Sequence, residues 1–505
     1  MRTRNTIYNV IAGLTSKLII CLCLFCVRKV MAESLDSNYI GLEGFFSNVI
    51  GLFSLVDLGF GTAIAYSLYD PIHKGETDKV NAIISLLKKV YIAVAFVIFL
   101  LSIAVSFSLG NYIKDIELEA VYIQKAFIIY AGSIAVTYLF AYQRTYIFAL
   151  QKNYILSIID SITKIVCSCI QVFLLSKFHS YLLYLFIVFM GNLITNYMAM
   201  AFLKRHNAFA VEITKYELPD EFKNRLKRDV KNLAITNLCW QGLVSTDNII
   251  ISMVVGVTDL AKNANYSAII QAGTSIIKSI LSGVNASFGD LLAEKKQEKI
   301  QMYFSHYIFI SHYIGGLASV CFFYLSNQFV EAWVGKFYVF DIHICLILSL
   351  NLYLSIMHKT IGDIVNLTGL FYESKPYAII SLCLNIGGSL IFAKVIGVIG
   401  VFIGTTISFA FLIITMLKIL TKTVVQIRKY VIIKKSFLYG IHMIVIFYIL
   451  MFILNEFNFF DDLIVKFLMI MIFYNFFSVL FFVKSENLHF FIRLLRRFNK
   501  TIFTR

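Results

Sequence analysis

Long apolar stretches recur along the whole chain and leave few folds open to it. A helix needs about 20 mostly apolar residues to cross the hydrocarbon core of a bilayer. The connections between the stretches are short, and the longest, 204–231, has fewer than thirty residues. We therefore predict an all-α, polytopic membrane protein with about 14 transmembrane helices. The predicted spans are approximately 7–30, 39–67, 90–109, 124–148, 154–176, 181–203, 232–256, 265–291, 303–325, 341–363, 377–395, 398–420, 436–454 and 462–482.

The composition agrees with a membrane protein. Apolar residues make up 59% of the 505 residues and charged residues 15%, whereas soluble domains have about 25% charged residues. This balance excludes a cytosolic enzyme, a secreted disulfide scaffold and a disordered chain. A net charge of +16 would suggest nucleic acid in a soluble protein. Here the cations lie between apolar stretches, where anionic lipid headgroups explain them better, so we expect membrane lipids and no nucleic acid as partners.

The distribution of Lys and Arg predicts the orientation of the chain. Even-numbered loops and the termini are rich in cations, with eight in 204–231 and six in 418–435. Cytoplasmic loops carry the excess of Lys and Arg, which places both termini in the cytoplasm. The odd-numbered loops and their margins hold Lys114, Lys177, Lys262, Lys336 and Lys394.

Motifs for soluble chemistry are missing from the sequence. It contains no Walker A motif and no Cys/His spacing typical of zinc, so we expect no catalytic residue, no metal and no cofactor. The first apolar stretch is too long for a signal peptide and lacks a cleavage site; we expect it to be retained. Three prolines, Pro71, Pro219 and Pro376, lie in predicted cytoplasmic loops.

Polar residues follow four of the predicted spans at helical spacing, so that each set shares one helix face. The second span has Glu43, Ser47, Gly51, Ser54 and Asp57, and the fifth has Asp160, Lys164, Ser168 and Gln171. The seventh span has Asn237, Gln241, Ser245, Asn248 and Ser252, with Asp247 at the edge of the face, and the eighth has Gln271, Ser275, Lys278, Ser282 and Asn285.

Charges at mid-span are costly and usually face a cavity or a partner. Lys17, Lys278 and Asp57 lie near mid-span, which favours a water-filled cavity. The alternative for a single Ser, Asn or Gln is a hydrogen bond that joins two helices. Asp160 and Lys164 have the i,i+4 spacing of a self-contained ion pair. Other cations lie near span ends, from which they can extend to the interface: Arg28, Lys29, Arg144 and Lys359.

The arrangement of the stripes indicates an internal repeat. Spans 1–2 and spans 7–8 each place a polar-striped pair at the start of a six-span block, and the basic loop separates the blocks. This is typical of two pseudo-symmetric six-helix lobes in a transporter. We predict an N-terminal lobe at 1–203, a basic cytoplasmic linker at 204–231, a C-terminal lobe at 232–420, and two further spans with a basic tail at 421–505.

Several of these segments resemble bacterial polysaccharide flippases of the multidrug/oligosaccharidyl-lipid/polysaccharide exporter superfamily. The resemblance is most specific in "LGFGTAIAYSLY" (58–69) and "STDNIIIS" (245–252), and it extends through "NASFGDLLAE" (285–294) and "GLFYESKPYAII" (369–380). It covers residues 1–420. The family has two lobes around a cationic central cavity, and fourteen spans suit it.

The resemblance implies transport of a lipid-linked oligosaccharide, a sugar repeat unit on undecaprenyl pyrophosphate, by alternating access between the leaflets. It further implies partnership with polysaccharide-assembly proteins such as a polymerase or a chain-length regulator. Lys17, Arg28, Lys164 and Lys278 would hold the pyrophosphate. The sugar hydroxyls would bond to Asn237, Gln241, Asn248, Gln271 and Asn285. A cavity ion pair or a coupling ion would involve Asp57, Asp160 or Asp247; the family usually has Glu where Asp57 stands.

Two other functions are alternatives to this interpretation of the sequence. The multidrug branch of the superfamily typically has twelve spans and an acidic first helix with a proline, whereas the first span here has Lys17, Arg28 and neither acid nor proline. A membrane polysaccharide polymerase or ligase would need a long outer loop with arginines or histidines, but the longest predicted outer loop, 326–340, holds only Lys336 as a cation.

Overall fold

The fold is helical throughout the part of the chain that the computed structural model describes. That part comprises residues 2–53, 68, 71–72, 74–107, 109, 118–150, 152–205, 218–221, 224, 238–239, 241–243, 245–294, 297–368, 370–426, 429–456 and 462–493. Its contacts divide the chain into two compact units, Met1–Ala264 and Asn265–Arg505.

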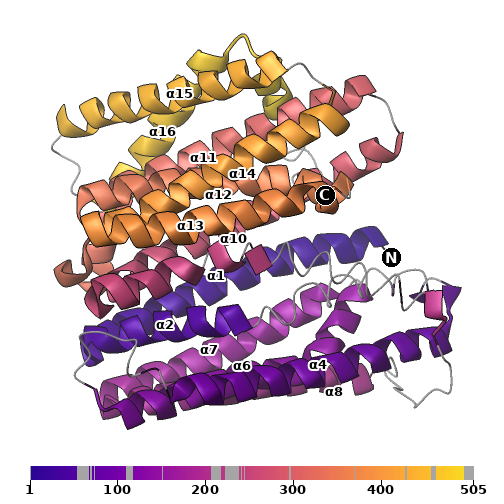
Figure 1. Ribbon diagram of the computed structural model, residues 1–505, viewed down its shortest axis with the longest axis vertical. Helices are drawn as coiled ribbons and strands as arrows, with labels where there is room; N and C mark the ends of the chain where they lie inside the picture. Colours follow the sequence, from indigo (N-terminus) through magenta and orange to yellow (C-terminus); the bar gives the residue numbers. More distant parts are fainter. Residues whose placement is uncertain are drawn as a thin grey trace. The chain divides into compact units, whose positions relative to one another are not determined.

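Unit 1 contains six long helices (Figure 1). α6 packs against both α4 and α8, and α7 packs against α1 and α8. A shorter helical segment follows and ends in a π-turn, Ile251–Val255, after which Gly256 adopts a φ of 146°. The helices are α1 (Arg2–Ser34), α2 (Ser37–Phe53), α4 (Thr77–Ser106), α6 (Ala120–Ala149), α7 (Asn153–Phe178) and α8 (Tyr181–Arg205).

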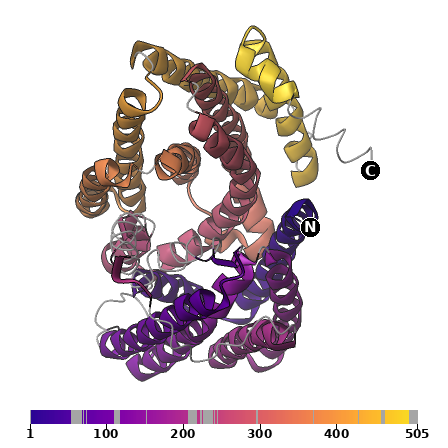
Figure 2. The ribbon, with the colours of Figure 1, turned by 90° about the vertical axis from the view of Figure 1, so that its right-hand side faces the viewer.

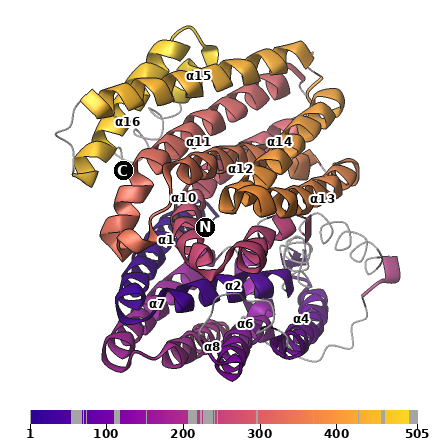
Figure 3. The ribbon, with the colours of Figure 1, turned by 60° about the vertical axis from the view of Figure 1, so that its left-hand side comes forward.

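Unit 2 is built from six further helices and most of α10 (Val257–Glu294), which begins in unit 1 (Figure 3). α12 packs against α11 and α14, α13 packs against α14, and the hairpin of α15 and α16 packs against α11. The helices are α11 (Gln297–Val334), α12 (Ile342–Thr368), α13 (Phe371–Ile396), α14 (Val398–Thr423), α15 (Lys429–Glu456) and α16 (Leu463–Phe482).

The two units share a pattern of helix pairing. The pairs α4–α6, α6–α8 and α7–α8 in unit 1 correspond in chain order to α11–α12, α12–α14 and α13–α14 in unit 2. Helices at equivalent places in the chain order thus make equivalent contacts, as an internal repeat would require. The hairpin α15–α16 has no counterpart in the order of unit 1.

Ten helices within the described residues are long and apolar enough to cross a membrane. The prediction of an all-α, multi-pass membrane protein is confirmed. α1 and α10 are also of spanning length, but their polar residues lower their mean hydropathy. Most helices extend beyond the predicted spans; α11 covers 297–334 rather than 303–325, because a helix can continue past the hydrocarbon into the headgroup region.

One expectation about proline was wrong. Pro376 lies inside α13, five residues after its start at Phe371, rather than in a loop. The span expected at 377–395 is the apolar part of a longer helix, and the proline occupies the extension before it. The missing N–H at this position removes the hydrogen bond that would close on the carbonyl of Tyr372.

Glycines on α2 let its backbone approach the segments on either side of the π-turn. A Cβ added at Gly41 would lie 2.6 Å from Cγ1 of Val257, and one at Gly44 would lie 3.3 Å from Cβ of Ala264. A Cβ at Gly51 would lie 2.8 Å from Nε2 of Gln241. These three positions form the glycine seam of α2, where a larger residue would require a neighbour to move.

A row of polar groups fixes the α15–α16 hairpin, drawn in amber to yellow in Figure 2, to the rest of unit 2. Nδ1 of His312 on α11 lies 2.8 Å from the hydroxyl of Tyr353 on α12, and its Nε2 lies 3.1 Å from Nδ1 of His442 on α15. Nε2 of His442 lies 3.1 Å from Oγ of Ser478 on α16. Both histidines are fully buried. Because apolar surfaces gain little by associating in lipid, such polar contacts set the position of a helix pair.

Candidate functional site

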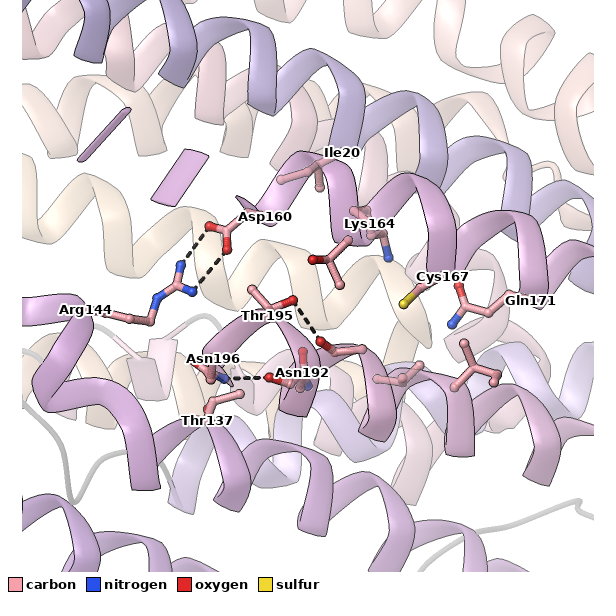
Figure 4. Close-up of a pocket in the computed structure, with 14 residues that line it drawn as sticks. Ile20, Thr137, Arg144, Asp160, Lys164, Cys167, Gln171, Asn192, Thr195 and Asn196 are labelled. Carbon is pink, nitrogen blue, oxygen red and sulfur yellow. Dashed lines mark hydrogen bonds and ion pairs between the residues drawn. The ribbon is translucent and has the colours of Figure 1, made fainter. Parts of the chain in front are cut away.

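A polar cavity of the described residues lies inside unit 1, among α1, α6, α7 and α8 (Figure 4). Its volume is about 320 Å³, within the range of ligand pockets. α7 explains why the cavity is polar. It turns Ile158, Ile162 and Phe173 outward, and it buries Ser168 and Gln171. In a membrane the apolar face of a helix meets lipid, so the polar face is directed to the interior.

An ion pair closes one end of this cavity. Arg144 of α6 donates two hydrogen bonds to Asp160 of α7, from Nη1 to Oδ1 at 3.0 Å and from Nη2 to Oδ2 at 2.7 Å (Figure 4). The two parallel bonds make the fork that Arg forms with carboxylates and phosphates. The side chains are 31% and 28% exposed, so the pair is accessible from the cavity.

The ion pair of Asp160 therefore involves another helix. The i,i+4 pair with Lys164 is not formed; Asp160 is bonded to Arg144 instead. This bond links α6 to α7. The sequence could not predict the pairing, because it depends on how α6 and α7 align across the turn between them.

The remaining lining of the cavity combines one further cation with amides and hydroxyls. The ammonium of Lys164, half-buried, lines the cavity beside Cys167 (Figure 4). Among the described residues no hydrogen bond or ion pair is found for it. Gln171 and Asn196 are each 2% exposed, and neither Oε1 of Gln171 nor Oδ1 of Asn196 has a hydrogen-bond partner. Buried amide oxygens normally have one, so these two atoms can accept bonds from a hydroxylated ligand.

Close packing of α7 on α8 holds these side chains in place. A Cβ added at Gly191 would lie 2.8 Å from Sγ of Cys167. Nearby, Nδ2 of Asn196 donates to the carbonyl of Asn192 at 2.7 Å, and Oγ1 of Thr195 donates to the carbonyl of Gly191 at 2.8 Å (Figure 4). The bond of the Asn196 amide nitrogen to its own helix leaves the amide oxygen to be satisfied from the cavity.

A second ion pair, more deeply buried, lies elsewhere in unit 1. Nη1 of Arg28 on α1 donates to Oε2 of Glu43 on α2 at 2.6 Å. Oε1 of Glu43 accepts from the hydroxyl of Tyr184 on α8 at 2.6 Å. Arg28 is 8% exposed, so it does not extend to the interface. This cluster joins three helices, and its charge is balanced within the unit.

The other predicted site residues of the described structure are distributed as follows. Nε2 of Gln241 donates to Oγ of Ser245 at 3.0 Å, and Oδ1 of Asn248 accepts from Nδ2 of Asn263. Lys17 and Asp247 are half-buried, whereas Gln271 and Lys278 on α10 are exposed. The cavity among α1, α6, α7 and α8 is lined by Lys164 and Asp160 of the predicted set.

Three predicted site residues cannot be placed. Asp57 and Asn237 lie outside the described residues. Asn285 lies within α10, but its side chain is also outside the description.

Several residues of these clusters, Gln171 among them, are missing from the predicted site. Arg144 lies near the end of a span, for which the sequence predicts extension to the interface, and Glu43 is recognisable only as part of a stripe. Asn196 lies on a span without a polar stripe. The useful signal for Arg144 is the acid at Asp160, because a carboxylate within a membrane span needs a cation.

Comparison with known proteins gives structural relatives. No family model matches the sequence, and no curated protein matches it. The inward closed conformation of the lipid II flippase MurJ is 16% identical with a TM-score of 0.67, covering 95% of this chain and 99% of that one.

Multidrug transporters are also similar in structure. The inward-facing conformation of a multidrug resistance MATE family transporter of the MOP superfamily is 14% identical with a TM-score of 0.63, covering 82% of this chain and 99% of that one. A mutant of the Vibrio cholerae MATE transporter VcmN is 12% identical with a TM-score of 0.58, covering 84% of this chain and 99% of that one. At these identities the likeness concerns the fold. This chain is a multi-pass membrane protein whose fold is similar to that of MurJ and the MATE proteins.

Proposed function

We propose that the protein is a flippase of the bacterial cytoplasmic membrane. It moves a lipid-linked oligosaccharide repeat unit on undecaprenyl pyrophosphate from the inner to the outer leaflet, for the synthesis of a surface polysaccharide. The carrier tail stays in lipid while alternating access transfers the headgroup, and no covalent bond is made or broken.

The observation that carries this proposal is the lining of the cavity in unit 1. A lipid-linked oligosaccharide presents a pyrophosphate next to sugar hydroxyls. The cavity offers the cation Lys164 for phosphate, and buried amide oxygens of Gln171 and Asn196 for hydroxyls. An apolar drug needs neither group. The similarity to a lipid II flippase over nearly the whole length of both chains adds support from the fold.

Other polar residues enter the proposal from the sequence. Lys17, Arg28 and Lys278 would contribute positive charge along the path of the pyrophosphate. Asp57 and Asp247 would bind a coupling ion or balance a cation of the cavity, and polysaccharide-assembly proteins would use the exported unit. Sugar contacts would come from Asn237, Gln241, Asn248, Gln271 and Asn285.

The proposal is tested by measuring the undecaprenyl-linked lipid pool in cells that lack the gene. After a pulse of radiolabelled sugar, we expect a complete repeat unit to accumulate on undecaprenyl pyrophosphate at the inner leaflet, with loss of surface polysaccharide. A normal lipid pool with intact polysaccharide would contradict the proposal and favour the multidrug function of the MATE neighbours. Repeat units that reach the outer leaflet but remain unpolymerised would indicate an enzyme instead.

A variant with an intact fold connects the phenotype to the protein. Lys278 is exposed on α10, so Lys278→Ala should insert into the membrane normally and still reduce export severalfold. Unchanged export at equal protein level would exclude Lys278 from the pyrophosphate path. Lys336, in the 3₁₀ turn between α11 and α12, offers a control, because Lys336→Ala removes the same charge from a loop.

A further inference from the structure

The guanidinium of Arg144 forms an anion-binding site, and the carboxylate of Asp160 occupies that site. Carboxylate and phosphate offer the guanidinium the same pair of oxygens, and the fork accepts either. A pair that only joined two helices would need no opening to a cavity. Here both side chains are nearly one-third exposed and line the cavity, so a ligand in the cavity can reach the guanidinium.

The position of the pair fits a ligand that comes from the cytoplasm. Arg144 lies five residues before the end of α6 at Ala149, and Asp160 lies seven residues after the start of α7 at Asn153. The turn between these helices is cytoplasmic by the distribution of Lys and Arg. From Asp160 the cavity lining continues along α7 to Gln171, which is about 16 Å at 1.5 Å per residue. The cationic end of the cavity is therefore near its cytoplasmic side, and the amide of Gln171 lies deeper.

Lys164 makes an exchange of partners feasible. A carboxylate displaced from Arg144 would be costly inside a membrane unless another cation neutralised it. Lys164 lies one turn further along α7, at the i,i+4 spacing in which an acid pairs with a following lysine. It lines the same cavity and forms no ion pair among the described residues. The displaced carboxylate thus has a partner within reach.

We propose that Arg144 is a phosphate-binding residue and that Asp160 competes with the phosphate for it. Binding of a phosphate or diphosphate group releases Asp160 to Lys164, and departure of the phosphate restores the Arg144–Asp160 pair. The inference rests on the proposed function for its substrate class. It adds Arg144 as a residue that binds the phosphate. It also adds Asp160 as a competing carboxylate that lowers the affinity for the phosphate, so that the anion can dissociate again.

The experiment measures binding of inorganic pyrophosphate to the full chain in phosphatidylcholine nanodiscs, by calorimetric titration at constant ionic strength. Asp160→Asn removes the competitor and should lower the Kd about tenfold, whereas Arg144→Gln should raise it at least tenfold. Arg144→Lys keeps the charge but loses the fork, so its Kd should rise severalfold. This variant tests the proposal even where Asp160→Asn does not fold.

A matched control separates the site from net charge. Asp363 on α12 is the acid of the ion pair with Lys359 in unit 2, so Asp363→Asn raises the net charge by the same amount at another place. It should leave the Kd for pyrophosphate unchanged. An equal gain for Asp363→Asn and Asp160→Asn, or a wild-type Kd in Arg144→Gln or Arg144→Lys, would overturn the proposal.

Two further arms identify the source of the phosphate and keep the two proposals distinct. Undecaprenyl pyrophosphate placed in the nanodisc should compete with inorganic pyrophosphate when the site takes a lipid-carried diphosphate; a lack of competition limits the site to soluble anions and overturns its role in flipping. Pyrophosphate binding that none of the variants changes, together with lipid accumulation in the deletion strain, would remove this inference and leave the flippase. Pyrophosphate binding that depends on Arg144, together with a normal lipid pool in the deletion strain, would remove the flippase proposal and leave this inference.

Discussion

At the scale of single residues, unit 1 neutralises two of its cations by acids on other helices. Arg28 pairs with Glu43 and Arg144 with Asp160, across 15 and 16 residues of chain. The polar faces can be predicted from the sequence, because helical spacing is visible in one segment. The partners cannot, because each pair depends on the alignment of two helices. For this reason the sequence alone assigns no acidic partner to Arg28 or Arg144.

The Arg28–Glu43 pair leads to a prediction about stability. Glu43→Gln leaves the buried Arg28 guanidinium without its counter-charge, which costs about 3–5 kcal/mol in a fully buried pair. Because the Glu43 side chain is 22% exposed, we expect a smaller loss of about 2–3 kcal/mol in the free energy of unfolding, measured in detergent micelles with a denaturant.

An exposed pair supplies the control. Glu76→Gln breaks the pair of Glu76 with Lys79, whose side chains are 38% and 28% exposed, and should cost less than about 1 kcal/mol. Equal losses for Glu43→Gln and Glu76→Gln would mean that Arg28 is neutralised by something other than Glu43.

At the scale of helices, the positions of most elements follow from hydropathy alone. α14 and α16 are predicted well because they are apolar over a full span, whereas α4 begins at Thr77, well before its predicted span of 90–109. The predicted ends of α11 and α13 lie too far inward, since hydropathy locates the hydrocarbon core and not the helix termini. Pro376 is the clearest example: it lies inside α13, where the polar extension of the helix has no apolar signal.

The glycine seam of α2 gives a prediction about packing. Gly41→Ala places a methyl group 2.6 Å from Cγ1 of Val257, so one of the two backbones must shift. Overpacking of this kind costs about 1–3 kcal/mol, and we expect a lower melting temperature of the purified protein. Gly132→Ala is the matched control, because its Cβ would be 3.7 Å or more from any neighbour. A melting temperature that falls equally in both variants would contradict the seam.

The histidine row gives a prediction for the C-terminal hairpin. His442→Leu removes the bonds to His312 and Ser478 and leaves a buried imidazole nitrogen unpaired, at a cost of about 1–3 kcal/mol. We expect faster proteolysis of the α15–α16 hairpin at unchanged expression. The protein with His489→Leu, an exposed position, should be cleaved at the wild-type rate. Equal rates for all three proteins would show that the row does not hold the hairpin.

At the scale of the whole molecule, the helical, multi-pass architecture could be predicted from the sequence, because it depends only on the succession of apolar segments. The matching pairs in the two units, such as α6–α8 and α12–α14, could not be derived from weak sequence similarity between the halves. The cavity could not be predicted from the sequence either, because four helices together form it. Its lining includes Asn196 from a helix that has no polar stripe.

The orientation of the chain is a prediction at this scale. The excess of Lys and Arg in even-numbered loops places the C-terminus in the cytoplasm. A C-terminal fusion to a fluorescent protein should fluoresce, and a fusion to alkaline phosphatase at the same position should be inactive. The same two reporters placed after Lys336, between α11 and α12, should give the opposite pattern. An active phosphatase at the C-terminus would reverse the topology.

The glycine seam of α2 has a consequence for movement as well as for packing. Glycine has no rotamers, so the α2 side of the contact can separate and close again without any side chain being reordered. Side-chain order on α2 therefore adds nothing to the free energy of opening or closing this contact.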